Sequence, residues 1–289
     1  MATGTTRSEE INNAQGPLRI DLNAILRNRL SPAKYRMIPR FLIRGVERLI
    51  KQDELNGVLE RTYPKRGTEF AVAALDDLGV KVEVRGLDNV PESGRFVFAS
   101  NHPLGGLDGI ALIAVLGAKY GDEHLRFPVN DLLMNVKPLD GIFTGINKFG
   151  RQGRASASCI NEIYASDDKQ VAIFPAGLVS RLGKRGVIAD LTWQKAFVAK
   201  ALEFDRDIIP VRIVAQNSML FYRTARWRKR LHIGVNLEQV LLPSELFKAS
   251  GSTITLIFGE PVTCHELRSC RLKPMELAAK LREKVYCLK

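Results

Sequence analysis

The chain has 289 residues, of which 45% are hydrophobic and 26% are charged, a composition typical of a globular protein with a sizeable core. Lys and Arg number 43 against 31 Asp and Glu, so the formal net charge is +12 at pH 7. This excess favours an anionic partner: a nucleic acid, an acidic carrier protein or an anionic membrane surface. Four cysteines without a C-x-x-C pair argue against a disulfide scaffold or a zinc ribbon and favour a reduced, cytoplasmic chain.

The N-terminal segment is polar and has no apolar stretch. We therefore expect a disordered tail over residues 1–18 and no signal peptide. No window of the chain reaches the 18 or so apolar residues that a bilayer span requires. If the protein meets a membrane, we expect it to lie on the surface as a peripheral protein.

Residues 19–80 are predicted to be mostly helical. Apolar residues recur at helical spacing between Ile38 and Ile50, and arginines stand at every fourth position from Arg36 to Arg48. An apolar face flanked by arginines suits a helix that lies in a membrane interface. A surface helix packed on the core with a solvated basic side has the same pattern, and periodicity alone does not separate the two.

From residue 81 to residue 289, short β-rich runs alternate with helical patterns. This alternation predicts an α/β fold with a mostly parallel sheet covered by helices, preceded by the N-terminal helical extension. No internal repeat and no linker divides the region, so we expect one catalytic domain with a C-terminal helix. The expected strands are 80–84, 95–99, 125–129, 171–174, 208–214 and 253–258, and the expected helices are 107–120, 155–165, 191–204 and 274–286.

The most informative stretch joins an apolar strand to an apolar helix. His102 follows the strand and Asp108 stands near the helix start, while Gly105 and Gly106 allow the intervening turn to fold back. A carboxylate beside an imidazole fixes its tautomer and leaves the other ring nitrogen to accept a proton. The alternatives are a helix N-cap for Asp108 and a structural turn for His102. The clustering of polar and glycine residues here favours the catalytic pair.

The run Asn101-His102-Pro-Leu-Gly-Gly-Leu-Asp108 resembles the acyltransferase block of the glycerol-phosphate and lysophospholipid acyltransferase family. In that family a histidine followed by an aspartate is the catalytic pair. The usual spacing is four residues, whereas this chain has five. The Gly-Gly form with the extra residue resembles the bacterial branch that O-acylates lyso-amino lipids, such as lyso-ornithine and lyso-glycine lipids. The resemblance implies an O-acyltransferase of lipid biosynthesis, with Asn101, Gly105 and Gly106 at the substrate.

A second block, 173–181, is similar to the family's Phe-Pro-Glu-Gly-Thr-Arg-Ser acceptor block. The positions that match, and that the resemblance places at the acceptor, are Phe174, Pro175, Gly177 and Ser180. Ala176 and Val179 replace the glutamate and the arginine that hold glycerol phosphate in the family. This departure argues against glycerol phosphate and for an acceptor with another anion, such as an amino-acid carboxylate.

The cation expected to meet that anion is Arg181, Lys184 or Arg185. Two weaker blocks stand in the family's order. The run 145–151 resembles the second block, whose arginine contacts the acceptor's anionic group and matches Arg151 here. The run 208–213 resembles the fourth block, an apolar strand with a proline. The four blocks together cover about residues 95–215.

Other sites fit the same residues less well. The run 177–184 is not a nucleotide-binding loop, because its glycine spacing is one residue too long. Ser180 does not stand in a G-x-S-x-G elbow, so a serine acyl-enzyme is not expected. His124, His232 and His265 lack metal-ligand spacing, and we expect no metal. The basic and aromatic run 221–230 is typical of a segment that binds RNA or a membrane interface, and also of a solvated loop. The acyltransferase blocks favour the membrane or an acidic acyl carrier as its partner.

The sequence thus predicts acyl transfer at the cytoplasmic face of the membrane, without any cofactor beyond the acyl donor. His102, oriented by Asp108, deprotonates an acceptor hydroxyl that attacks the thioester of acyl carrier protein or CoA. Turn N–H groups near Gly105 and Gly177 are the expected oxyanion donors. The expected acceptor is the 3-hydroxyl of an N-(3-hydroxyacyl) amino acid. One alternative is 1-acylglycerol-3-phosphate, which gives phosphatidic acid. The alternative from another class is a non-catalytic nucleic-acid- or membrane-binding protein.

Overall fold

A seven-stranded sheet forms the centre of the protein. The computed structural model describes residues 16–130, 133–145, 150–183, 186–232 and 237–289. The strand order is β1-β9-β8-β2-β5-β3-β4, and all neighbours run parallel except β8 and β9. The strands of this sheet are β1 (Lys81–Arg85), β2 (Phe96–Ser100), β3 (Leu125–Val129), β4 (Phe143–Gly145), β5 (Gln170–Ile173), β8 (Asp207–Val214) and β9 (Thr253–Phe258). A separate antiparallel hairpin consists of β6 (Arg181–Leu182) and β7 (Ile188–Ala189).

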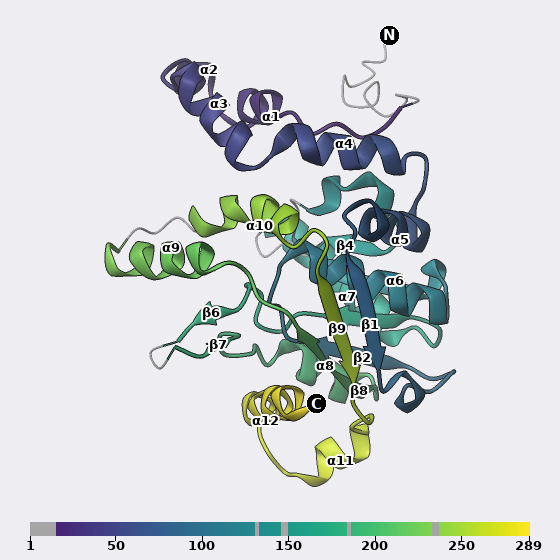
Figure 1. Ribbon diagram of the computed structural model, residues 1–289. Helices are drawn as coiled ribbons and strands as arrows, with labels where there is room; N and C mark the ends of the chain where they lie inside the picture. Colours follow the sequence, from purple (N-terminus) through teal and green to yellow (C-terminus); the bar gives the residue numbers. More distant parts are fainter. Residues whose placement is uncertain (1–15, 131–132, 146–149, 184–185, 233–236) are drawn as a thin grey trace, which may run out of the picture.

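Helices cover the sheet, and the helices nearest the N-terminus of the chain lie farther from it (Figure 1). The first group is α1 (Leu22–Arg29), α2 (Pro32–Arg36), α3 (Arg40–Leu49), α4 (Gln52–Thr62), α5 (Gly67–Asp77) and α6 (Gly106–Tyr120). The second group is α7 (Gly150–Ala165), α8 (Ala196–Glu203), α9 (Met219–Arg230), α10 (Leu242–Lys248), α11 (Cys264–Ser269) and α12 (Pro274–Cys287). Short 3-10 turns are η2 (Leu87–Asn89), η3 (Asp122–His124), η4 (Leu133–Asn135), η5 (Lys137–Leu139) and η6 (Leu237–Leu241).

The two faces of the sheet bury two apolar clusters. Strand β2 is buried throughout, and its alternate side chains enter different clusters: Phe98 packs with α5 and α6, and Val97 packs with α7, α8 and α12. A strand that is buried on both faces has a continuous apolar sequence. The apolar sequence of β2 therefore predicts a parallel sheet that helices cover on both faces. The predicted α/β fold with its N-terminal helices is confirmed.

Several helices and strands have boundaries that differ from those predicted from the sequence. The helix expected over 191–204 begins only at Ala196, because the preceding residues form a loop in which the Gln194 N–H donates to the Pro175 carbonyl. The basic run at 221–230 is helical, and Ser218 caps α9 by accepting from the Phe221 N–H. The short hairpin β6–β7 and the edge strand β4 were not predicted, because two- and three-residue strands carry no periodicity.

The arginine stripe predicted between Arg36 and Arg48 is divided between two helices. Helix α2 ends at Arg36 and α3 begins at Arg40, with Pro39 at the N-cap. On this segment Ile43 is buried, but Met37 is 80% exposed and Phe41 is 71% exposed, so part of its apolar surface does not pack on the core. None of the helices in the described ranges combines the length and the apolar composition that a membrane span requires.

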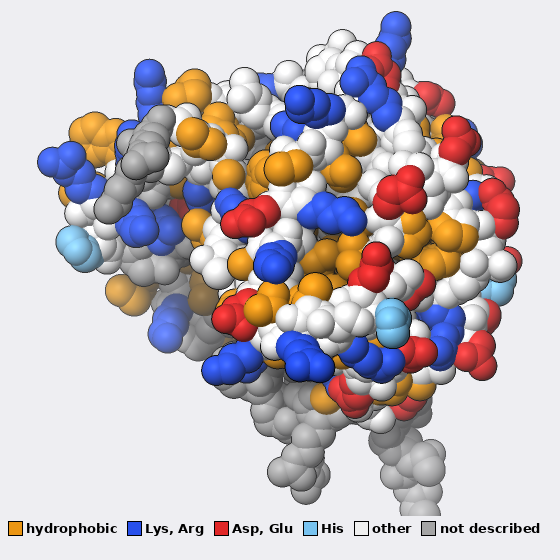
Figure 2. Space-filling model, turned by 90° about the horizontal axis from the view of Figure 1, so that it is seen from below, with side chains coloured by type: hydrophobic (Ala, Val, Ile, Leu, Met, Phe, Trp, Pro, Cys, Tyr) orange, Lys and Arg blue, Asp and Glu red, His pale blue; other side chains and the backbone are white. Residues whose placement is uncertain are grey.

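Charge is unevenly distributed over the surface. In the view from below, Lys and Arg side chains prevail on the side where Figure 1 draws α9, and acidic side chains prevail on the opposite side (Figure 2). Helix α9 exposes Trp227 among four exposed cations, which are Arg223, Arg226, Lys229 and Arg230. The positive side of the molecule therefore combines cations with an aromatic side chain.

A buried arginine fixes the connection between α7 and β5. Arg206 is fully buried, and its guanidinium donates to the carbonyls of Tyr164, Lys169, Ile163 and Ser166 at 2.5–2.9 Å. Several of these carbonyls lie at the C-terminal end of α7, where helices lack intrahelical partners. Burial lowers the pKa of Arg206 to about 10, so the side chain stays charged at neutral pH.

We expect Arg206→Met to lower the free energy of unfolding by about 3 kcal/mol or more, because each buried carbonyl left without a donor costs roughly 1–3 kcal/mol. Chemical denaturation measures the change. Arg268→Met is the matched control, since the Arg268 ion pair with Asp205 is more than half exposed and should contribute less than about 1 kcal/mol. Equal destabilisation by the two substitutions would contradict the capping role of Arg206.

Candidate functional site

The candidate site lies on the loop that joins β2 to α6. Strand β2 lies between β8 and β5, so the loop leaves the sheet at its centre. His102 follows the last strand residue by two positions, and Gly106 is the first residue of α6. The carboxyl edge of a mostly parallel sheet is where ligand crevices form in α/β folds.

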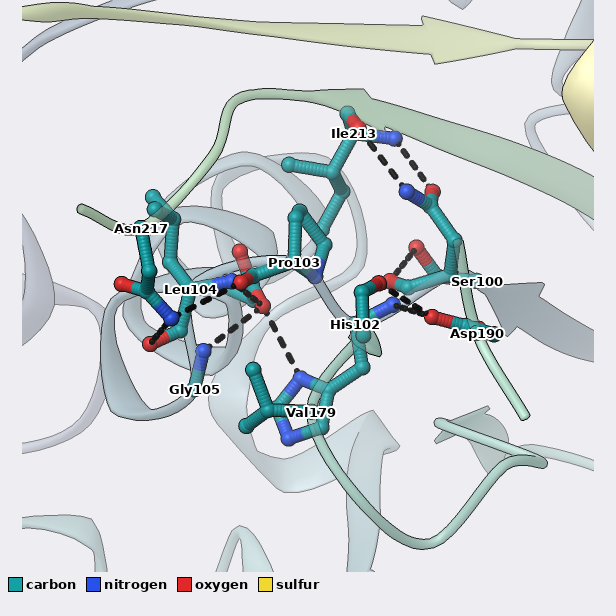
Figure 3. A network of polar contacts seen from close by, with 12 residues as sticks. Ser100, His102, Pro103, Leu104, Gly105, Val179, Asp190, Ile213 and Asn217 are labelled. Carbon is teal, nitrogen blue, oxygen red and sulfur yellow. Dashed lines mark hydrogen bonds and ion pairs between the residues drawn. The ribbon is translucent and has the colours of Figure 1, made fainter. Parts of the chain in front are cut away.

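His102 and Asp108 form the predicted pair. The distance from His102 Nδ1 to Asp108 Oδ2 is 2.9 Å, and the same carboxylate oxygen accepts from the N–H groups of Leu104 (2.8 Å) and Gly105 (3.0 Å) (Figure 3). Asp108 is fully buried, and burial raises its pKa, while the hydrogen bonds from His102 and the two backbone N–H groups oppose that rise. Asp108 therefore acts both as a cap of α6 and as the partner of His102.

The imidazole of His102 is held with one nitrogen free. Its ring stacks on Phe174, with 4.0 Å between ring centroids and 15° between planes. The side chain is 17% exposed, and Nε2 has no hydrogen-bond partner among the described residues. Because the carboxylate accepts the Nδ1 proton, Nε2 of the neutral ring carries a lone pair. An imidazole held in this way is able to accept a proton at Nε2.

The main chain of His102 is held from the opposite side. Its carbonyl accepts from the Ser180 N–H at 2.7 Å, and its N–H donates to Asp190 Oδ1 at 3.1 Å (Figure 3). The Ser180 hydroxyl donates to the same Asp190 oxygen at 2.6 Å, and Trp193 Nε1 donates to Asp190 Oδ2 at 2.9 Å. The sequence prediction did not include Asp190 or Trp193, since neither stands in a motif and only the folded chain brings them to this loop.

Several residues that were predicted to bind substrate form hydrogen bonds within the protein. The Asn101 side chain donates to the Ile213 carbonyl at 2.9 Å and accepts from the Ile213 N–H at 2.7 Å, which joins the end of β2 to β8. Gly105 and Gly177 adopt positive φ angles of 97° and 65°. Their own N–H groups donate to Asp108 Oδ2 and to the Phe174 carbonyl, respectively. These two N–H groups are therefore engaged within the protein, and the expected oxyanion donors near them stay a prediction.

The Gly106 N–H has no hydrogen-bond partner among the described residues. It lies in the first turn of α6, where the N–H groups of a helix lack intrahelical acceptors and the helix dipole favours negative charge. Pro175 accepts from the Gln194 N–H through its carbonyl, and thus connects the second block to the loop before α8. Among the three glycines predicted to lie at the substrate, Gly106 is thus the one whose N–H has no partner within the described residues.

The guanidinium of Arg181 is paired within the protein. It pairs with fully buried Glu238 at 2.9 Å and donates to the Val179 carbonyl at 2.7 Å. Arg228 pairs with the other Glu238 oxygen at 2.8 Å. Ala176 and Val179, which occupy the positions of the family's glutamate and arginine, are buried apolar side chains. The contacts thus assign Arg181 to a buried ion cluster.

The remaining predicted cations are not described by the structure. Lys184 and Arg185 lie outside the described residues, as does most of the 145–151 block. Arg151 is in the first turn of α7, and its side chain also lies outside the described part. Within the described residues, no group of three or more His, Cys, Asp and Glu side chains could hold a metal ion. The expectations about acceptor cations and about a metal-free reaction stay predictions.

Comparison with known proteins identifies the family. The acyltransferase family model matches residues 25–289. Lyso-glycine lipid O-acyltransferases of Bacteroides thetaiotaomicron and Phocaeicola vulgatus are each 39% identical to this chain over 269 residues. These alignments cover 93% of this chain and 97% and 95% of the two relatives. A crystal structure of the 1-acyl-sn-glycerophosphate acyltransferase PlsC from Thermotoga maritima is 17% identical, with a TM-score of 0.40 over 86% of this chain and 94% of that one.

The matched region includes the whole sheet and the loop that carries His102 and Asp108. A non-catalytic nucleic-acid- or membrane-binding protein, the alternative that the charge left open, does not account for this match. The chain belongs to the acyltransferase family and is an enzyme that transfers acyl groups.

Proposed function

We propose that this enzyme transfers a fatty acyl chain from an acyl thioester to the 3-hydroxyl of an N-(3-hydroxyacyl) amino acid, in particular N-(3-hydroxyacyl)glycine. The observation that carries the reaction type is the His102–Asp108 pair at 2.9 Å with a free Nε2. The acceptor rests on the two relatives at 39% identity, whose names specify a lyso-glycine lipid. The product is a diacylated amino lipid, and the donor is acyl carrier protein or CoA.

The reaction follows from the free nitrogen of His102. Nε2 accepts the proton of the acceptor hydroxyl as its oxygen attacks the thioester carbonyl, and Asp108 stabilises the imidazolium that forms. The carbonyl π electrons move to oxygen, which gives a tetrahedral intermediate. When that intermediate collapses, the C–S bond breaks and the thiolate leaves with the proton from Nε2. An ester has formed, the thiol is released and His102 returns to its neutral form.

The oxyanion of the tetrahedral intermediate requires donors. We assign one of them to the Gly106 N–H, because it is free and lies in the first turn of α6, beside the catalytic loop. Asp108 accepts from the Gly105 N–H next to it and so keeps the turn in this conformation. The same carboxylate therefore supports the base and the proposed donor.

The apolar side chains at two positions of the acceptor block also favour an acceptor without phosphate. Val179 lies against the catalytic loop, where an added Cβ on Gly105 would meet its Cγ2 at 3.4 Å. Ala176 is 8% exposed and Val179 is 5% exposed, so neither offers charge or a hydrogen bond to a phosphate. A dianionic phosphate beside these two side chains would receive neither charge nor a hydrogen bond from them in exchange for its hydration.

A paired acceptor assay tests the proposal. Purified enzyme is incubated with N-(3-hydroxyacyl)glycine or with lysophosphatidic acid, and each acceptor is combined with acyl carrier protein or CoA thioesters of one chain length. We expect an O-acylated product from the amino lipid and at least tenfold lower kcat/KM with lysophosphatidic acid, a difference of about 1.4 kcal/mol. Product from lysophosphatidic acid alone would overturn the proposed acceptor.

Asp108→Asn tests the role of the carboxylate beyond capping. The amide oxygen can take the place of Oδ2 and accept from His102 Nδ1 and from the Leu104 and Gly105 N–H groups, but it carries no negative charge to stabilise the imidazolium that forms when Nε2 takes a proton. We expect normal folding by circular dichroism and a kcat on the order of 10²-fold or more below wild type. Wild-type turnover would reduce Asp108 to a helix cap.

We further propose that the enzyme docks on an anionic membrane through α2 and α3. Met37 and Phe41 are largely exposed, and Leu42 is 50% exposed beside them. The surrounding arginines at 36, 40, 44 and 48 are all exposed. This combination lets apolar side chains enter the acyl region while guanidinium groups pair with lipid phosphates. A surface next to lipid also suits an acceptor that is itself a lipid.

The double substitution Met37→Ser and Phe41→Ser should weaken co-sedimentation with phosphatidylglycerol-containing vesicles by roughly 10- to 100-fold, as each buried apolar side chain contributes on the order of 1 kcal/mol or more. Met275→Ser, at an exposed position of α12, is the matched control and should bind vesicles as wild type does. Salt-sensitive binding to RNA without binding to vesicles would contradict membrane docking.

A further inference from the structure

We propose that Asp190 is a positioning residue for the acyl transfer: its carboxylate holds the main chain of His102 so that the imidazole meets Asp108 and the substrate. The inference rests on the proposed function, because its readout is the turnover of that reaction. Asp190 lies directly after the hairpin strand β7 and is 5% exposed. It does not belong to the family blocks found in the sequence.

The contacts of Asp190 converge on the catalytic loop. Its Oδ1 accepts from the His102 N–H, and it also accepts from the hydroxyl of Ser180, whose own N–H donates to the His102 carbonyl. Both main-chain groups of His102 are thus fixed by one carboxylate and the serine that it orients. The ring is fixed separately, by Asp108 at Nδ1 and by Phe174 at its face.

The backbone of Asp190 is tied to the C-terminal helix. Its N–H donates to the Tyr286 hydroxyl at 2.7 Å, and its carbonyl accepts from Arg282 Nη2 at 2.7 Å. Both partners are on α12, which packs on the same face of the sheet as α8. Asp190 therefore connects a helix near the end of the chain to the catalytic residue at position 102.

Only a carboxylate satisfies this set of donors. Three donors from His102, Ser180 and Trp193 point at its two oxygens, and a carboxylate is an acceptor at both. Among the described residues, no Lys or Arg side chain forms an ion pair with this carboxylate, so its buried charge is stabilised by N–H and O–H groups. An asparagine has one acceptor oxygen, and its N–H₂ would face at least one of the three donors.

Asp190→Asn is the direct test, with steady-state kinetics and NMR of the ¹⁵N-labelled enzyme. A shift of about 1 Å in a catalytic group costs on the order of 10²-fold in rate. We expect kcat to fall roughly 10- to 100-fold, while KM for the acceptor changes by less than about threefold. The NMR signal of the His102 Nδ1 proton, assigned by its loss in His102→Gln, should shift or broaden.

The matched control is Asp122→Asn. The Asp122 carboxylate also joins two elements through several hydrogen bonds, since it accepts from the N–H and the hydroxyl of Thr68. It lies beyond the far end of the 15-residue helix α6, about 22 Å along the helix from the catalytic loop. This variant should lose thermal stability yet keep the wild-type kcat and the wild-type His102 signal.

The outcomes separate the two proposals. If Asp190→Asn loses stability but keeps kcat and the His102 signal, the carboxylate is only structural and the inference is wrong. If wild-type enzyme does not acylate the amino lipid in the paired assay, the proposed acceptor fails, whatever Asp190 does. Should Asp190→Asn not fold, Tyr286→Phe decides, because it removes only the hydroxyl that receives the Asp190 N–H. A severalfold loss of kcat supports the inference, and an unchanged kcat overturns it.

Discussion

The site depends on one oxygen atom of a buried carboxylate. Asp108 Oδ2 receives the Nδ1 proton of His102 and the N–H groups of Leu104 and Gly105, and so joins the ring, the turn and the start of α6 at one point. A carboxylate in an apolar surrounding is costly unless donors surround it. Three N–H donors on one oxygen offset part of that cost, although burial still raises the pKa of Asp108. The imidazole of His102, which we propose as the base, is therefore held in one orientation within the protein, as preorganised catalysis requires.

A second carboxylate completes the positioning from the opposite side of the loop. Asp108 fixes the ring of His102, whereas Asp190 and Ser180 fix its main chain. The first contact is local, six residues apart, and the second joins residues 88 positions apart. Helix α12 extends the second network to the end of the chain through Arg282 and Tyr286. The geometry of His102 is thus set by both short-range turn chemistry and long-range packing.

This difference in range explains how much the sequence could predict. The strands of the central sheet other than β4 were found because they are apolar or β-rich runs that alternate with helical patterns. The His102–Asp108 pair was found because its spacing places both residues on one turn. Asp190 and Glu238 could not be found, since an isolated acidic residue has no pattern until the fold supplies its donors. For the same reason Arg181 was expected at an acceptor anion, although a glutamate 57 positions away pairs with it.

The net charge of +12 is explained best by its location. Exposed arginines accompany the exposed apolar side chains of α2 and α3, and exposed cations surround Trp227 on α9.

His102→Ala tests the central claim, that Nε2 of this residue is the base for acyl transfer. With N-(3-hydroxyacyl)glycine and an acyl thioester, the account predicts a folded protein whose kcat is on the order of 10²- to 10⁴-fold below wild type. A folded His102→Ala enzyme that turns over at the wild-type rate would contradict it.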